Sequence, residues 1–203
     1  KIILFCFILQ AMVVAKPINI VTTTSDLGAI AREIGGDILK VTVLASPNAD
    51  AHYIDPKPSY IITLKKADIL ITGGKGLEDS WLPPLILKSR NGRINKNGSG
   101  YIDASSEVRL LEVPLGKVDR SQGDVHPYGN PHFLTSPKNS IVFGKKIAKE
   151  IIKLKPELKT QIEQNLKTYT KQLEALDRKY FGKHKGVNII TFHKSYEYIA
   201  HFL

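Results

Sequence analysis

The sequence predicts an α/β fold in which helices cover a parallel β-sheet. Short runs rich in Ile, Val and Leu alternate with amphipathic helical segments through the first half of the chain. A strand–helix–strand order of this kind is typical of a parallel sheet. A long, almost uninterrupted helical region then follows. In such sheets ligands bind beyond the carboxyl ends of the strands, so we expect a functional site at that edge.

Each element in the first half has a local signal. β-branched runs predict strands at residues 18–21, 39–44 and 69–72. Apolar periodicity predicts helices at residues 27–34, 59–66 and 78–87. Ser25 or Asp26 can cap the first helix, and Gly35 and Gly36 can stop it. Residues 91–100 are rich in glycine and asparagine and predict an exposed turn.

The second half is predicted to be mostly helical, with one helix at residues 139–155 and a longer one that Pro156 opens and Gly182 ends. The longer helix has about 25 residues, or roughly 37 Å. Its apolar stripe consists of Ile162, Leu166, Tyr169, Leu173, Leu176 and Tyr180. This pattern fits a strut between two lobes and a helix packed on one core equally well. Residues 187–192 predict a further strand, and SYEYIA begins a helix.

The first 15 residues are typical of a secretory signal peptide. A lysine precedes an apolar run at residues 2–14, and Ala15 is a small residue suited to cleavage. The run is shorter than the roughly 20 apolar residues that span a bilayer; a buried strand or a short membrane anchor are the alternatives. Cys6, the single cysteine, lies in this segment, so the mature chain is expected to have no disulfide partner and no thiolate ligand.

The formal net charge of +10 comes mainly from residues 138–185, which contain 13 Lys or Arg against 5 Asp or Glu. A basic surplus of this kind can bind nucleic acid or an anionic membrane surface. The solvated faces of two helices also explain it. Because an exported chain meets little nucleic acid, no nucleic-acid partner is expected.

Three histidines are candidate metal ligands: His52 in NADAHYIDPKPSY, His132 in GNPHFLTSPKN and His193 in IITFHKSYEYIA. They lie 80 and 61 positions apart along the chain, whereas the ligands of a zinc finger crowd into one short loop. The spacing therefore predicts a site that the fold assembles from separate elements. Imidazole is a ligand that suits zinc, copper, iron and nickel.

Together these segments resemble the metal-specific solute-binding proteins of bacterial ABC importers, the zinc and manganese receptors. The strongest matches are NADAHYIDPKPSYIITLKKADILITGGKGLEDSWL, the segment GNPHF with Pro137 and Asn139 after it, and ITFHKSYEYIA. The long helix between the second and third matches also fits. The resemblance covers nearly all of the chain after the expected signal peptide.

The resemblance implies two α/β lobes with parallel sheets, joined by a long helix, and one metal held in the cleft between them. It implies His52 and His132 as ligands from the first lobe and His193 as a ligand from the second. The family's fourth ligand is a carboxylate further along the second lobe, beyond Leu203. The implied protein is a monomeric receptor, periplasmic or otherwise extracytoplasmic, that delivers a divalent metal ion to an ABC permease.

This resemblance also predicts how the chain is divided. We expect a signal peptide at residues 1–15, an N-terminal metal-binding α/β lobe at 16–137, a helical segment with the inter-lobe helix at 138–185, and the start of a C-terminal lobe at 186–203. The sequence stops at Leu203, and a strand with half a helix cannot form a core. Most of the second lobe is therefore expected to be missing.

Zinc (Zn²⁺) is the expected metal, and manganese (Mn²⁺) is the alternative. Three neutral imidazoles and one carboxylate leave a net charge of about +1 around a divalent ion, a donor set that suits zinc. A carboxylate in place of His193 would shift the preference toward manganese. Four protein ligands without an open position capture a metal instead of activating water.

Two departures from the family pattern concern the second ligand. Ser136 stands where the family usually has an acidic residue before the proline, so we expect a helix cap or a supporting contact to be lost. The stretch 107–129 is short and contains only His126, so no metal-gathering loop is expected. His126 itself is predicted to anchor its loop, with a ligand or supporting role as the alternative.

The remaining polar candidates are predicted to support the site or the surface. A ligating histidine normally donates its second N–H to a carboxylate or a carbonyl, and Asp50, Asp55 and Glu197 lie close enough in sequence to be considered. His184 is expected at the surface, His201 at the surface or in packing between lobes, and Trp81 in the core.

Two other classes of function stay open. A secreted zinc hydrolase would need an open coordination position, a bound water and a general base, and the sequence has no His-Glu-x-x-His motif. A surface adhesion protein could use the basic helix face without any metal. Bound metal distinguishes the receptor from the adhesion protein, and catalytic turnover distinguishes the hydrolase from both.

Overall fold

A computed structural model describes residues 17–116, 118, 126–180, 182–183, 186–191 and 194–202. The expected signal peptide at residues 1–15 lies outside these residues, as do His184 and His193. No helix in the described part of the chain is both long enough and apolar enough to cross a bilayer.

A parallel sheet of four strands forms the centre of the molecule. Its strands pair in the order β2-β1-β3-β4 and comprise β1 (Ile18–Thr22), β2 (Leu39–Val43), β3 (Ile69–Thr72) and β4 (Tyr101–Asp103). The three predicted strands are confirmed within one residue at their ends. The sequence did not predict β4, whose three residues are too few to show a period. It forms because Leu70 to Thr72 of β3 pair with it.

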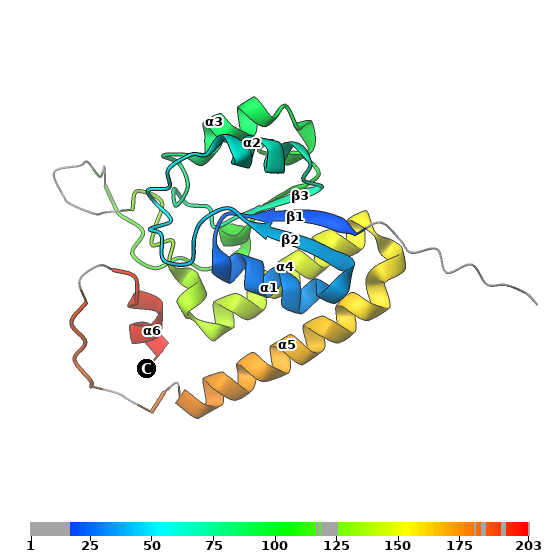
Figure 1. Ribbon diagram of the computed structural model, residues 1–203. Helices are drawn as coiled ribbons and strands as arrows, with labels where there is room; N and C mark the ends of the chain where they lie inside the picture. The colour runs from blue at the N-terminus through cyan, green and yellow to red at the C-terminus, as the bar shows by residue number, and fades with distance from the viewer. Residues whose placement is uncertain are drawn as a thin grey trace, which may run out of the picture.

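Helices cover both faces of this sheet (Figure 1). One face carries α1 (Ser25–Gly35), α4 (Pro137–Leu154) and α5 (Lys159–Tyr180), and the other carries α2 (Pro58–Lys65) and α3 (Leu82–Ser89). The last helix is α6 (Glu197–Phe202). Short 3₁₀ turns lie at Gly36–Ile38, Gly92–Ile94, Ala104–Glu107, Phe133–Thr135 and Pro156–Leu158. The α/β class predicted from the sequence is therefore confirmed.

The alternation of side chains along the central strands creates two separate cores. Ile18 and Ile20 of β1 pack toward α1, α4 and α5, whereas Val21 packs toward α2 and α3. On β3, Leu70 likewise belongs to the second core. Gly144 lets α4 and α5 approach closely, because a Cβ there would lie 2.8 Å from Cε1 of Tyr169. Central strands buried on both sides give the rigid frame that a binding site needs.

Two predicted helix starts differ from the observed ones. The cap of α1 is Thr24, so Ser25 and Asp26 lie in its first turn, where an acidic side chain favours the helix dipole. The prediction that α3 begins at residue 78 is wrong, because it begins at Leu82. Pro83 and Pro84 explain the later start, since proline is tolerated in the first turn of a helix but not in its interior.

The predicted stop of α1 and the predicted turn after α3 had different outcomes. Gly36 closes α1 with φ +55°, and its N–H donates to the carbonyl of Arg32, which confirms the stop. The stretch 91–100 is not a wholly exposed turn, because Ile94 is fully buried in the second core.

The long helix α5 is anchored along its first half. Its predicted apolar stripe contacts α1 and α4 through buried Ile162 and Tyr169, whereas Leu176 and Tyr180 near its end are exposed. In the second half, Leu173 still packs against the first core, and Asp177 Oδ2 lies 3.6 Å from Lys138 Nζ on α4. The described residues therefore place most of the helix on one core, and its exposed apolar side chains lie near its C-terminal end.

The strand predicted at residues 187–192 is not formed in the part that the structure describes. Residues 187–191 have no regular secondary structure, and Ile190 is 99% exposed. A strand exists only through hydrogen bonds to a neighbouring strand, and none of the described strands pairs with this segment. The composition of residues 187–192 therefore predicted a strand, but no described strand lies beside residues 187–191 to pair with it.

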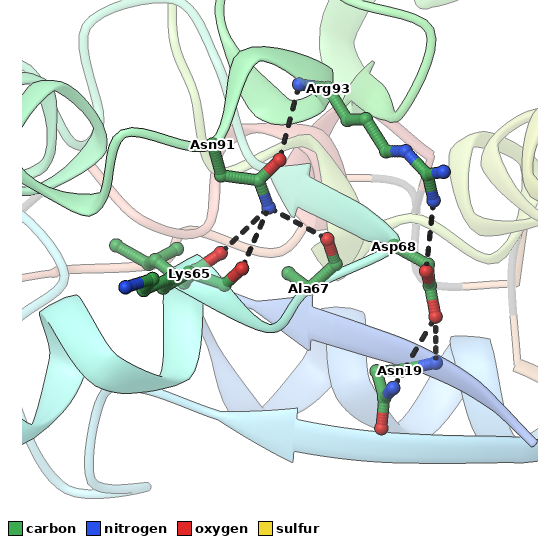
Figure 2. Close-up of polar contacts among 7 residues, drawn as sticks. Asn19, Lys65, Ala67, Asp68, Asn91 and Arg93 are labelled. Carbon is green, nitrogen blue, oxygen red and sulfur yellow. Dashed lines mark hydrogen bonds and ion pairs between the residues drawn. The ribbon is translucent and has the colours of Figure 1, made fainter.

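Polar contacts join the strands and loops at the amino edge of the sheet (Figure 2). The carboxylate of Asp68 accepts a hydrogen bond from the backbone N–H of Asn19 at 2.9 Å. It also forms an ion pair with the guanidinium of Arg93 at 3.1 Å. The amide of Asn91 donates to the carbonyls of Leu64 and Ala67 at 2.9 and 2.8 Å. These contacts hold the edge opposite the expected functional edge.

We predict that shortening a side chain near the end of α5 destabilises the protein less than shortening one near its start. Ile162→Ala should lower the free energy of unfolding by about 2–5 kcal/mol, because it leaves a cavity in the core. Leu176→Ala, on the same helix and 42% exposed, should cost less than about 1 kcal/mol. Urea unfolding followed by circular dichroism measures both values, and equal costs would contradict the described packing.

Candidate metal centre

The loops that leave the carboxyl ends of the strands surround a cavity of about 770 Å³. Its walls come from residues 24–27 after β1, residues 45–47 and 49–51 after β2, Gly73 and Leu77 after β3, and residues 131–135. Ser195 closes it from the C-terminal segment. Because β1 lies between β2 and β3, the chain departs in opposite directions at this point, which is where open α/β sheets bind their ligands.

The loop that carries His52 is held at several backbone positions. It begins as a continuation of β2, with the N–H groups of Leu44 and Ala45 donating to carbonyls after β1. The Nε1–H of buried Trp81 donates to the carbonyl of Ala51 at 2.9 Å, and Ser80 donates to the carbonyl of His52. Trp81 is a core residue as predicted, and it also fixes the position of this loop.

Asp50 supports His52 through the backbone. Its Oδ1 accepts the backbone N–H of His52 at 2.9 Å. The contact predicted from the sequence was with the imidazole ring of His52 instead. Asp55 is exposed.

A tight turn carries His126 and leads to His132. The N–H of Gly129 donates to the carbonyl of His126 at 3.2 Å, and Gly129 adopts φ +97°, a conformation that glycine adopts without strain. A Cβ at Gly129 would also lie 3.0 Å from Val113 and 3.1 Å from Leu110. The turn is therefore packed closely against residues 110–113.

His52, His126 and His132 converge on one point. Each ring offers a nitrogen, and these nitrogens all lie within 4.8 Å of one another. The rings of His52 and His126 stack with centroids 4.9 Å apart and an interplanar angle of 16°. The ring of His132 meets both at 5.5 Å, edge to face. All three are half-buried, so an ion among them would be shielded on one side and reachable from the other.

The described part of the chain thus brings His52 and His132 together, as the sequence analysis expected, and adds His126, which was predicted to anchor its loop. The clue to His126 was its position six residues before His132, on the far side of a Pro-Tyr-Gly turn. Spacing alone could not show that this turn faces the His52 loop. His193 cannot be placed, because it lies outside the described residues. His201 is exposed, as predicted.

Buried Asn130 connects the His132 turn to the C-terminal segment. Its Oδ1 accepts the backbone N–H of His132 at 2.9 Å, and its amide donates to the carbonyl of Lys194 at 2.7 Å. The hydroxyl of Tyr198, on α6, donates to the carbonyl of Asn130 at 2.8 Å and accepts the N–H of Leu111 at 3.0 Å. Asn130 and Tyr198 are almost fully buried.

An ion pair adds to this connection. Lys194 Nζ lies 2.6 Å from Glu112 Oε1, and the Asn130 amide donates to Glu112 Oε2 at 3.0 Å. Partial burial opposes ionisation of Glu112, but the hydrogen bonds and the charge of Lys194 outweigh it, so the pKa of Glu112 lies below its usual value. This stabilisation is present at neutral pH and is lost as the pH falls through the lowered pKa.

A buried carboxylate ties the ends of β1 and β3 together beside the cavity. Glu78 accepts hydrogen bonds from the hydroxyl of Thr23 at 2.6 Å and from the N–H groups of Gly73 and Gly74 at 2.7 and 3.1 Å. Burial raises the pKa of Glu78, although these hydrogen bonds partly offset the effect. Its oxygens are committed to the backbone, so we assign it a structural role.

Ser136 corrects one sequence-based expectation. The expected loss of a cap before Pro137 is wrong, because the Ser136 hydroxyl accepts the N–H of Asn139 at 3.5 Å and caps α4. Serine is a favoured capping residue. His132 immediately precedes the 3₁₀ turn Phe133–Thr135, which leads into α4.

The described residues thus combine a parallel α/β sheet with three imidazoles beyond its carboxyl edge that could together hold a metal ion. The family model for ZnuA, the zinc-uptake complex component A, periplasmic, matches residues 20–202. The chain therefore belongs to this family of solute-binding proteins.

Individual relatives have names that mention different metals. The chain is 28% identical over 178 residues to the manganese ABC transporter substrate-binding lipoprotein scaA of Streptococcus gordonii, covering 86% of this chain and 53% of the relative. It is 27% identical over 173 residues to the iron ABC transporter substrate-binding lipoprotein MtsA of Streptococcus pyogenes serotype M1, covering 84% and 52%. The chain thus spans about half the length of these curated relatives.

The fold also matches solved structures. A zinc-bound ZnuA deletion mutant superposes with a TM-score of 0.75 at 26% identity, covering 92% of this chain and 66% of that one.

We predict that Asn130 holds the His132 turn against the C-terminal segment. Asn130→Ala should lower the free energy of unfolding by about 2–3 kcal/mol, because buried groups lose their hydrogen-bond partners. Asn95→Ala, at an exposed asparagine, should change it by less than about 0.5 kcal/mol. Thermal unfolding without metal measures both effects, and equal stability of the two variants would show that Asn130 is dispensable.

Proposed function

We propose that this protein is an extracytoplasmic receptor that binds a divalent transition metal, zinc first, and delivers it to an ABC permease. The observation that carries the proposal is the convergence of His52, His126 and His132 at the carboxyl edge of the sheet. The names of the relatives, which include ABC transporter substrate-binding lipoproteins, agree with it. The predicted division into signal peptide (1–15), first lobe (16–137), helical segment (138–185) and second lobe (from 186) is part of this proposal.

The proposed core ligands are His52, His132 and His193. The first two are supported by their ring separation of 5.5 Å. His193 is included because the segment ITFHKSYEYIA matches the family pattern. The described segment that begins at Lys194 is joined to the His132 turn by Asn130, which contacts the Lys194 carbonyl and the His132 N–H.

Zinc is the proposed cargo because the donor set is nitrogen-rich. Neutral imidazoles bind zinc more tightly than manganese or ferrous iron, which lie lower in the usual order of affinities. The relatives are named for manganese and iron, and one structural neighbour holds zinc. The ligand chemistry of this chain, more than the name of any relative, therefore supports zinc.

A binding protein fits the site better than a hydrolase does. Hydrolytic zinc sites need a general base beside the metal-bound water, and the metal-ligating cluster found among the described residues contains imidazoles only. The nearby buried carboxylate of Glu78 already accepts hydrogen bonds from the backbone. Release of the metal to a permease, instead of turnover, is the proposed outcome of binding.

Removal of either described core ligand should weaken zinc binding. We expect His52→Ala and His132→Ala each to raise the zinc dissociation constant by about 100-fold, since each of a few ligands carries a large share of the binding free energy. His201→Ala, an exposed histidine outside the cluster, should bind zinc as the unaltered chain does. Competition titration against a chelator measures these constants for zinc and for manganese. Manganese bound more tightly than zinc would refute the assignment of the metal.

Zinc affinity should also fall as the pH is lowered from about 7.5 to about 5. Free imidazole has an ordinary pKa of about 6.5, and a protonated ring cannot bind a metal. Isothermal titration in buffers of different ionisation enthalpy would detect both the loss of affinity and the protons released on binding. An affinity that stays constant across this range would rule out ligation by histidine.

A further inference from the structure

His126 belongs to the imidazole cluster but is not among the core ligands proposed above. It lies on a different loop from His52, yet the two rings stack at 4.9 Å. Its ring also faces His132 at 5.5 Å, the same separation that relates His132 to His52. Position and distance therefore do not distinguish His126 from the two proposed ligands.

The distances are close to those that a zinc ion requires. With Zn–N bonds of about 2.0–2.1 Å, tetrahedral ligand nitrogens lie about 3.3 Å apart. The three candidate nitrogens already lie within 4.8 Å of one another, so small side-chain rotations would bring them to that spacing. The Nε2 atoms of His52 and His126 are shielded from solvent, which favours ligation over exposure to water.

The turn that carries His126 holds this residue beside His52 and His132. Gly129 closes the turn with φ +97° and packs against Leu110 and Val113.

We propose that His126 is a further metal ligand, so that the sheet-bearing lobe alone holds the ion through three imidazoles. This inference rests on the proposed function and deepens it. Three protein ligands leave one position of a tetrahedral zinc ion open.

A purely structural role is the competing explanation, because stacking on His52 could by itself hold the two loops together. Phenylalanine separates these roles, since it keeps an aromatic ring but has no ligand nitrogen. The experiment therefore compares His126→Phe with His126→Ala in the full chain, each alone and combined with His193→Ala. His201→Ala serves as the matched histidine control.

Two readouts are used. Zinc dissociation constants come from chelator competition, and the visible absorption of bound Co²⁺ reports the number and geometry of its ligands. Circular dichroism of the metal-free variants checks that each one folds. We expect His126→Phe and His126→Ala to weaken zinc binding by about 100-fold and to change the cobalt spectrum equally. In the His193→Ala background, the loss of His126 should abolish stable binding.

The outcomes separate this inference from the proposed function. If His126→Phe keeps the affinity and cobalt spectrum of the unaltered chain, the ring acts by stacking and the inference is overturned, while the receptor proposal stands. The same holds if both substitutions behave like His201→Ala. If the unaltered chain binds neither zinc nor cobalt, the receptor proposal itself fails, and this inference fails with it.

Discussion

Parallel pairing of β1 with β2 on one side and β3 on the other is the constraint on which the site depends. Because these strands run in one direction, their loops all leave from the same edge. Hydrogen bonds from Thr23, Gly73 and Gly74 to the buried carboxylate of Glu78 hold the ends of β1 and β3 together. The cavity that includes His132 in its lining is a consequence of this strand order.

The two edges of the sheet use buried or half-buried polar side chains for different purposes. At the amino edge, Asp68 contacts Asn19 on β1 and Arg93 after α3, and Asn91 donates to the carbonyls of Leu64 and Ala67 (Figure 2). At the carboxyl edge, Asn130 joins the His132 turn to Lys194 and Tyr198. A buried amide specifies the path of the chain, because each unmet hydrogen bond would cost free energy. The contacts at the amino edge thus stabilise the fold, and the candidate metal ligands lie at the carboxyl edge.

A metal site made of separate loops has a particular advantage for a receptor. The His52 loop is held by Trp81, and the turn from His126 to His132 is held by residues 110–113, so the rings are positioned before an ion arrives. Such preorganisation reduces the ordering that binding must supply. The segment from Lys194 onward is joined to the His132 turn through the Lys194–Glu112 ion pair and the hydrogen bonds of Asn130.

Local sequence patterns by themselves determined most of the helices, three of the described strands and the stop at Gly36, because periodicity and flanking residues act over short stretches of chain. They also identified His52 and His132 as candidate ligands, and the described structure brings these two together. Tertiary structure alone decided the rest. The start of α3 depended on where two prolines could be accommodated, and β4 existed only beside β3. Residues 187–191 have the composition of a strand but no strand beside them. His126 joined the cluster because two loops meet in space, and contact between distant loops leaves no periodic trace in a sequence.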